Sequence, residues 1–250
     1  MPTTAEGFTR RLAELGERLS DQGALVLQMV EGGFDHLFAP GQAALTAIQA
    51  AEDTVDKADV AIERLAVALL ADATESAARL PEAQLRTVLT IVKVNNELER
   101  IADAALACAT LAQRLSDGNA DGQNAPPTTF RVLTNSVVGL VRDAINALSS
   151  GDARLARIVL QSDEAVEAFK ETLVRDAEEK LRAGRLDAHA AVLLLEIATA
   201  THTIAEHAAN IAEQLLYLHT GIIVRHVQGK WQEVPLDGPP AQGEAGPKAD

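Results

Sequence analysis

Aromatic residues and cysteine are scarce in this sequence. Phenylalanine, tyrosine and tryptophan make up 3% of the 250 residues, although apolar residues in total make up 47%. This balance favours closely packed helices, because β-strands are enriched in aromatic and β-branched residues. A single cysteine, Cys108, excludes an internal disulfide. We therefore expect an all-α fold with a sizeable core, in which Cys108 is a small core residue.

Positive charge is also in short supply. The chain carries 22 basic and 36 acidic residues, which gives a formal net charge of −14 at pH 7. This charge opposes contact with the phosphates of nucleic acids and with anionic membrane surfaces, so we expect no nucleic-acid binding. The first six residues lack the basic and apolar regions that a signal peptide would have. Glu196 and His202 interrupt the apolar segment 190–204 before it reaches transmembrane length. These features predict a cytoplasmic protein.

The motifs of common catalytic sites are absent as well. The sequence contains no glycine-rich phosphate loop, no His-Glu-x-x-His zinc helix and no nucleophile elbow. It therefore predicts a protein that is not an enzyme.

Apolar residues recur at spacings of three and four along six segments, as in amphipathic helices. The expected helices run from about residue 8 to the break at Pro40-Gly41, then over 42–77, 81–116, 128–148, from the break at 149–151 to 183, and over 186–220. We predict two tandem three-helix bundles, 1–116 and 128–226, joined by a linker, 117–127, and followed by a largely disordered tail, 227–250. No segment sustains the period-two alternation of a strand, so we expect no sheet.

Four pairs of residues have the spacing i, i+4, which places both side chains on one face of a helix. The pairs are Glu52 with Asp56, Glu99 with Asp103, Asp163 with Glu167, and His202 with Glu206. The step from Glu52 to Asp163 is 111 positions, and the step from Glu99 to His202 is 103. Because each offset holds for both members of a pair, the chain contains a duplicated helical module.

Each pair lies in a row of residues whose ends are apolar, so we expect the rows to face the core. Carboxylates crowded on facing helices repel one another and resist desolvation, and a bridging metal ion removes both costs. We therefore predict one metal site in each half. Mainly oxygen ligands fit divalent or trivalent ions such as iron, manganese, magnesium or zinc without selecting among them. The first site, with Asp59 and Glu63 on the same stripe, should bind metal more firmly than the second, where His202 replaces a carboxylate.

The remaining histidines have no partner at ligand spacing. For His36, His189, His219 and His226 we expect surface positions or hydrogen bonds between helices. His207 follows Glu206 directly and points to another face, so support of a metal ligand is a secondary possibility for it.

Several short motifs resemble signatures of the PhoU family of phosphate-uptake regulators. In the first half the motifs are Pro81-Glu82-Ala83-Gln84-Leu85-Arg86, Lys93-Val94 and Leu98-Glu99-Arg100-Ile101-Ala102-Asp103. In the second half they are His207-Ala208-Ala209-Asn210-Ile211-Ala212-Glu213 and Tyr217-Leu218-His219-Thr220-Gly221. The resemblance covers nearly the whole chain up to about His226. It departs from the family's Glu-Arg-Ile-x-Asp at His202-Thr203-Ile204-Ala205-Glu206, which implies a second site with fewer ions or with zinc.

This resemblance implies two three-helix bundles with multinuclear metal clusters. The first cluster would use Glu52, Asp56, Glu99 and Asp103, and the second would use Asp163, Glu167, His202 and Glu206. The resemblance also implies a cytoplasmic adaptor that represses phosphate uptake and the phosphate-starvation response. Such an adaptor couples a phosphate ABC transporter ATPase to a phosphate-sensing histidine kinase and reaches the membrane only through these partners. We expect a homodimer.

Two other functions stay open at this point. A helical-bundle di-metal enzyme would need a Glu-x-x-His motif on each of two helices, and the sequence has none. A metal-free helical scaffold would instead leave the acidic rows solvated or bound to basic partners. Stabilisation of metal-free protein by added metal separates the scaffold from the two metal-binding functions.

Overall fold

The computed structural model describes residues 5–118, 126–221, 223–227 and 230–234. Its helices are α1 (Ala5–Phe38), α2 (Gln42–Glu75), α3 (Glu82–Asp117), α4 (Thr128–Ser150), α5 (Ala153–Arg182) and α6 (Ala188–Thr220). These helices confirm the predicted all-α fold of two three-helix units. Most of the predicted linker 117–127 lies outside the described residues, so that domain boundary stays a prediction.

Short polar and glycine signals set where several helices begin and end. The side chains of Asp152 and Asp187 precede α5 and α6 and accept hydrogen bonds from backbone N–H groups of the first turn. Gly151 and Gly221 follow α4 and α6 with φ values of 66° and 70°, in the left-handed region that favours glycine. The helix ends were predictable because these signals are local.

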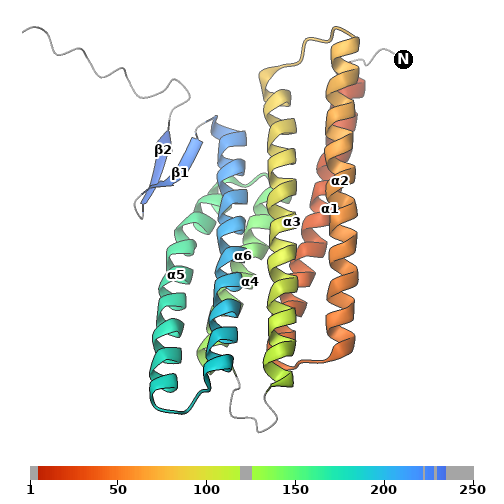
Figure 1. The fold of residues 1–250 in the computed structure, drawn as a ribbon. Helices are drawn as coiled ribbons and strands as arrows, with labels where there is room; N and C mark the ends of the chain where they lie inside the picture. Colours follow the sequence, from red (N-terminus) through yellow and green to blue (C-terminus); the bar gives the residue numbers. More distant parts are fainter. Residues whose placement is uncertain (1–4, 119–125, 222, 228–229, 235–250) are drawn as a thin grey trace, which may run out of the picture.

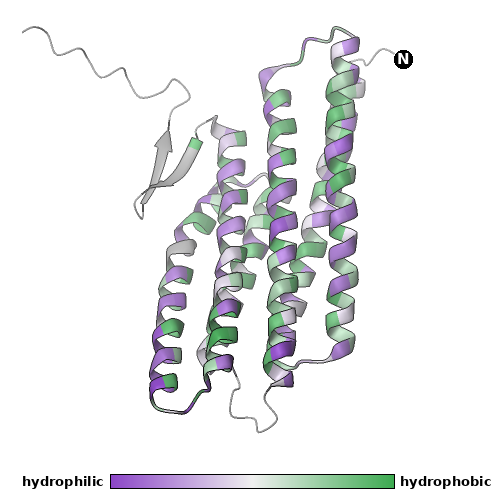
Figure 2. Cartoon of the chain, viewed as in Figure 1, coloured by the Kyte–Doolittle hydropathy of each residue, from purple (hydrophilic) through white to green (hydrophobic). Residues whose placement is uncertain are grey.

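The helices α3 and α6 form the centre of the molecule. They run antiparallel and pack along each other, with α1 and α2 against α3, and with α4 and α5 against α6 (Figure 1). Leu98 and Ile101 of α3 and Ile197, Ile204 and Ile211 of α6 are fully buried. Figure 2 shows hydrophobic residues recurring between hydrophilic ones along each helix, as the apolar periodicity predicts. The repeated modules therefore join mainly through their third helices, with a smaller contact between α1 and α4.

By length and composition alone, α6 could cross a membrane. Half of its most apolar stretch is buried inside the fold, where it contacts α3, α4 and α5. The buried core helix of a globular fold passes the same test, and the position of α6 between its neighbours accounts for its apolar composition.

A short antiparallel hairpin follows α6 and differs from the sequence expectation of no sheet. Strand β1 (Ile223–Val227) pairs with β2 (Lys230–Val234), with Ile223 opposite Val234 and Val227 opposite Lys230. The tail predicted to be disordered from 227 thus begins with strand residues, while residues 228–229 and 235–250 lie outside the described residues. Five residues per strand are too few for a period-two pattern to stand out, and only the β-branched residues carry the signal.

The last turn of α1, just before the connection to α2, contains a buried histidine. His36 is 1% exposed, and its Nδ1 accepts a hydrogen bond from the backbone N–H of Gly41 at 3.3 Å. Burial lowers the pKa of His36 from its ordinary value of 6.5, and the side chain of Gln113 partly offsets this effect. The fold therefore stabilises the neutral ring, whose Nδ1 is free to accept.

We expect His36 to make the protein less stable at mildly acidic pH. Because its pKa is lower in the folded state, the unfolded chain takes up this proton first as pH falls below about 6.5, and folding is penalised until the folded pKa is passed. The slope from one such group is at most about 1.4 kcal/mol per pH unit. Urea unfolding between pH 5 and 7.5 should show this slope in the wild type and in the exposed-site variant His189→Asn. If the free energy of unfolding of His36→Asn changed with pH as steeply as that of the wild type, His36 would not be the group responsible.

Candidate metal centres and the seam between the helix bundles

The first predicted ligand set lies on two neighbouring helices. Glu52 and Asp56 are on α2, and Glu99 and Asp103 are on α3. Burial raises the pKa of Glu52, and the charges of Asp56 and Asp103 raise it further. Burial and the charge of Asp56 likewise raise the pKa of Asp103. The structure therefore brings the four carboxylates into one negatively charged region between α2 and α3.

The neighbouring acids extend this region along α2. Burial and the charges of Glu63 and Asp56 raise the pKa of Asp59. The buried amide of Asn95 on α3 donates to Asp59 Oδ1 at 2.6 Å and to the Asp59 carbonyl oxygen at 3.1 Å. This contact fixes the acidic stretch of α2 against α3.

The acidic rows flank the core, although the sequence analysis expected them to face it. The buried stripe of α2 contains Ile48, Val55, Ile62 and Leu69, whereas Asp56 is exposed. Asp56 follows Val55 directly, and a step of one residue turns a side chain by about 100° around a helix. The i, i+4 spacing predicts a common face and does not predict which way that face points.

Within the described residues, no three Asp, Glu, His or Cys side chains converge closely enough to hold a metal ion. Among the same residues, Glu52, Asp56, Glu99 and Asp103 form no ion pair with a lysine or arginine. The charge of Arg100 lowers the pKa of Glu99, but burial and three neighbouring carboxylates, Asp103 first, outweigh it. This carboxylate set suits a cation by charge and by ligand chemistry.

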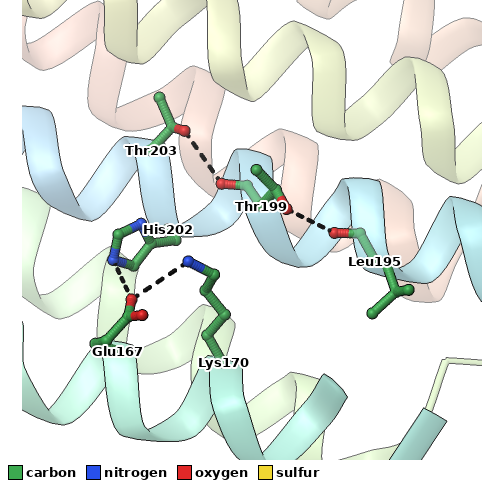
Figure 3. Close-up of polar contacts among 6 residues, drawn as sticks. All are labelled: Glu167, Lys170, Leu195, Thr199, His202 and Thr203. Atoms are coloured by element: carbon green, nitrogen blue, oxygen red, sulfur yellow. Dashed lines mark hydrogen bonds and ion pairs between the residues drawn. The ribbon is translucent and has the colours of Figure 1, made fainter. Parts of the chain in front are cut away.

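The second predicted set is arranged differently. Glu167 Oε2 lies 2.5 Å from His202 Nε2 and 3.4 Å from Lys170 Nζ (Figure 3). The lysine ammonium thus lies beside the oxygen that a metal ion would need. Glu206 is exposed on the next turn of α6, and the side chain of Asp163 lies outside the described residues. The structure brings Glu167 and His202 together, but an ammonium neutralises this carboxylate, so the residues present fit a metal ion less well here.

A polar cluster that the sequence analysis missed joins α3 to α6. Glu97 Oε2 lies 2.6 Å from His207 Nδ1 and accepts a hydrogen bond from Asn210 Nδ2 at 3.1 Å. The Glu97 and His207 side chains are only 20% and 12% exposed. Burial raises the pKa of Glu97, but the hydrogen bonds and charges of its partners outweigh it and hold the pKa below its ordinary value. We call Glu97, His207 and Asn210 the seam cluster.

The internal repeat relates the seam cluster to three small residues elsewhere along the contact between α3 and α6. With the offset of 103 positions, Glu97 corresponds to Ala200, His207 to Ala104, and Asn210 to Ala107. These three alanines line an open groove of about 460 Å³ between α3 and α6, together with Arg100, Asp103, Thr203 and His207. Three polar side chains on one side of the seam are thus replaced by three methyl groups on the other. In the sequence, this cluster is detectable as three positions that are polar in one repeat and alanine in the other.

The duplicated architecture agrees with comparisons to known proteins. The sequence profile of the PhoU domain matches residues 19–112 and again residues 130–215. The chain belongs to the PhoU family. The two matched PhoU domains correspond to the two repeats, and each contains one half of the α3 and α6 seam.

Curated relatives and solved structures match along most of their length. The phosphate-specific transport system accessory protein PhoU homolog 1 of Thermotoga maritima is 25% identical over 214 residues, which cover 86% of this chain and 89% of that protein. The PhoU homolog of Pseudomonas aeruginosa is 26% identical over 226 residues, with 89% of each chain covered. The crystal structure of PhoU from Pseudomonas aeruginosa superposes with a TM-score of 0.78 at 25% identity and covers 86% of this chain and 99% of that chain. PhoU from Streptococcus pneumoniae shares the fold, with a TM-score of 0.77 and 23% identity.

Proposed function

We propose that this protein is a cytoplasmic accessory protein that negatively regulates a phosphate-specific transport system and the phosphate-starvation response. The observation that carries the proposal is the match of both PhoU domains to relatives that are phosphate-specific transport system accessory proteins, over most of the length of both chains. The partners in this proposal are the transporter ATPase and a phosphate-sensing histidine kinase, and the acting form is a homodimer.

We infer that the protein acts by binding these partners and catalyses no reaction itself. The acidic stretch of α2 and α3 presents carboxylates on rigid helices, and among the described residues no serine, threonine or cysteine side chain is paired there with a histidine. Cys108 is fully buried, and this burial raises the pKa of its thiol to about 12, so it is not a nucleophile at neutral pH. Long helix faces suit the docking of other proteins.

Deletion of the gene tests the regulatory proposal directly. A strain without the gene should express phosphate-starvation genes in phosphate-rich medium, and a plasmid copy of the wild-type gene should restore repression. The readout is a reporter fused to a starvation-induced promoter, measured at high and low phosphate. Normal repression in a deletion strain that has no second PhoU protein would overturn the proposal.

We further propose that Glu52, Asp56, Glu99 and Asp103 bind metal ions such as iron, manganese, magnesium or zinc. The support is the mutual raising of carboxylate pKa values without an ion-paired lysine or arginine among the described residues. A bound cation would remove this repulsion and join α2 to α3. The second set, Asp163, Glu167, His202 and Glu206, would bind metal more weakly, because Lys170 already neutralises Glu167.

Metal titration of variants in each ligand set tests which of the two sets binds metal. Added manganese or iron should raise the melting temperature of metal-free wild-type protein, because a ligand that binds only the folded state stabilises it. The double variant Glu52→Gln/Asp103→Asn should lose most of this rise and most of the bound metal measured by elemental analysis. Glu167→Gln/Glu206→Gln is the matched control and should keep both. Unchanged metal content in the first variant would refute the assignment.

A further inference from the structure

A small apolar cavity lies inside the second bundle, near the turn that joins α5 to α6. Its volume is about 110 Å³, and its walls include Phe130 of α4, Leu173 and Ala177 of α5, and Leu194 of α6, all of which are buried. An engineered cavity of about 150 Å³ with similar walls stays dry and binds benzene. The chemistry of these walls therefore suits the apolar part of a small molecule, about one ring or a short chain in size.

Two cationic residues, Lys180 and Arg185, also line this cavity. The turn that carries them is a Schellman motif: Gly184, with φ 65°, donates its N–H to the Leu181 carbonyl at 3.1 Å, and Arg185 donates its N–H to the Lys180 carbonyl at 2.9 Å. In this motif the positions of Lys180 and Arg185 usually hold a pair of apolar side chains in contact. Here the same backbone geometry places two cations at the edge of an apolar cavity.

Local charge pairing accounts for only one of these cations. Lys180 Nζ lies 2.8 Å from Asp176 Oδ2, and the negative end of the α5 dipole also favours a lysine in the last helical turn. Arg185 lies beyond the helix end, and among the described residues its guanidinium has no hydrogen bond or ion pair. A guanidinium that has no ionic partner at the edge of an apolar cavity complements a carboxylate.

We propose that this cavity binds a small amphiphilic anion, with its apolar ring or short chain inside the cavity and its carboxylate paired with Arg185 and Lys180. The cavity volume limits the buried part to about six carbon atoms, because the slightly larger benzene-binding cavity holds one ring. The site lies in the second bundle and uses none of the acidic residues assigned to metal. It therefore adds a ligand to the proposed regulator and does not depend on metal binding.

Binding of benzoate and of its neutral analogue benzyl alcohol tests the proposal on the full-length protein. Isothermal titration calorimetry and the methyl NMR shifts of labelled leucine should show benzoate binding to the wild type with a dissociation constant of about 1 mM. Ala177→Leu, which fills the cavity, should weaken the binding of both compounds at least about tenfold. Arg185→Gln should weaken benzoate binding about tenfold and leave benzyl alcohol unchanged, because only the carboxylate loses a partner.

Arg182→Gln is the matched control. Arg182 is exposed, pairs with Glu178 at 2.9 Å and does not line the cavity, so its substitution should leave benzoate binding unchanged. Arg185 is exposed too, and its substitution should not disturb folding, which keeps the test decisive if Ala177→Leu fails to fold. The proposal is overturned by a wild type that shows no benzoate binding at about 10 mM. Equal binding by Arg185→Gln and wild type, or binding that survives filling of the cavity, would overturn it as well.

Discussion

Replacement of Gly33 with alanine should lower the free energy of unfolding by about 1–2 kcal/mol, whereas replacement of Gly16 with alanine should raise it by about 0.5–1 kcal/mol. Both glycines lie inside α1, where alanine is the better helix former. A Cβ atom at Gly33 would lie 3.0 Å from the backbone carbonyl oxygen of Ala105 on α3. A Cβ atom at Gly16 would meet nothing within 4 Å. The same substitution therefore has opposite signs at the two positions.

The physical reason is that backbone cannot move aside as a flexible side chain can. Relief of the contact at Gly33 requires α1 to shift away from α3, which loosens the packing of buried neighbours such as Phe34 and Val30. Urea unfolding followed by circular dichroism measures both variants against the wild type. Stabilisation of the protein by Gly33→Ala would show that α1 and α3 do not approach as closely as the structure indicates.

The sequence predicted the helices well because their signals are local. Pro40-Gly41 separates α1 from α2, and Gly151 separates α4 from α5, close to the predicted positions. The resemblance to the PhoU family is confirmed by the match of both domains. The close approach at Gly33 was not predictable, because nothing in the sequence separates it from Gly16. Which glycine meets another helix depends on how α1 is rotated in the finished bundle.

The candidate sites were predictable only as far as residue spacing allows. The i, i+4 pairs placed Glu52 with Asp56 and Glu99 with Asp103 on common faces, and the structure brings these four carboxylates together. The spacing did not predict that those faces lie at the flank of the core, because a shift of one residue turns a side chain by about 100° around the helix. The approach of Lys170 to Glu167 was missed as well, because an i, i+3 lysine can extend to solvent or fold back onto the carboxylate.

The seam cluster was missed because it is a tertiary contact. Glu97 and His207 are 110 residues apart and come from different repeats, so no local pattern connects them. His207 was expected at most to support a metal ligand next to Glu206, and no motif marked Glu97. A comparison of the repeats position by position would have marked Glu97, His207 and Asn210, since all three correspond to alanines.

Replacement of His207 with alanine should lower the free energy of unfolding by about 2–4 kcal/mol. The substitution leaves the largely buried carboxylate of Glu97 with the hydrogen bond from Asn210 as its remaining direct contact. Removal of the partner of a fully buried charged group costs about 3–5 kcal/mol, and the residual exposure of the Glu97 and His207 side chains reduces this cost. Urea unfolding followed by circular dichroism gives the value, with the exposed-site variant His189→Ala as the control, for which we expect a change within about 0.5 kcal/mol.

A variant that copies the other side of the seam gives the sharper test. Glu97→Ala/His207→Ala/Asn210→Ala carries alanine at the same three repeat positions where Ala200, Ala104 and Ala107 already occur. Because no buried charge is left without a partner, the triple variant should be less destabilised than the sum of its three single variants, by about 1–3 kcal/mol. Additive single-variant costs would mean that Glu97, His207 and Asn210 do not act together. A triple variant as stable as the wild type would mean that apolar packing alone holds α3 against α6.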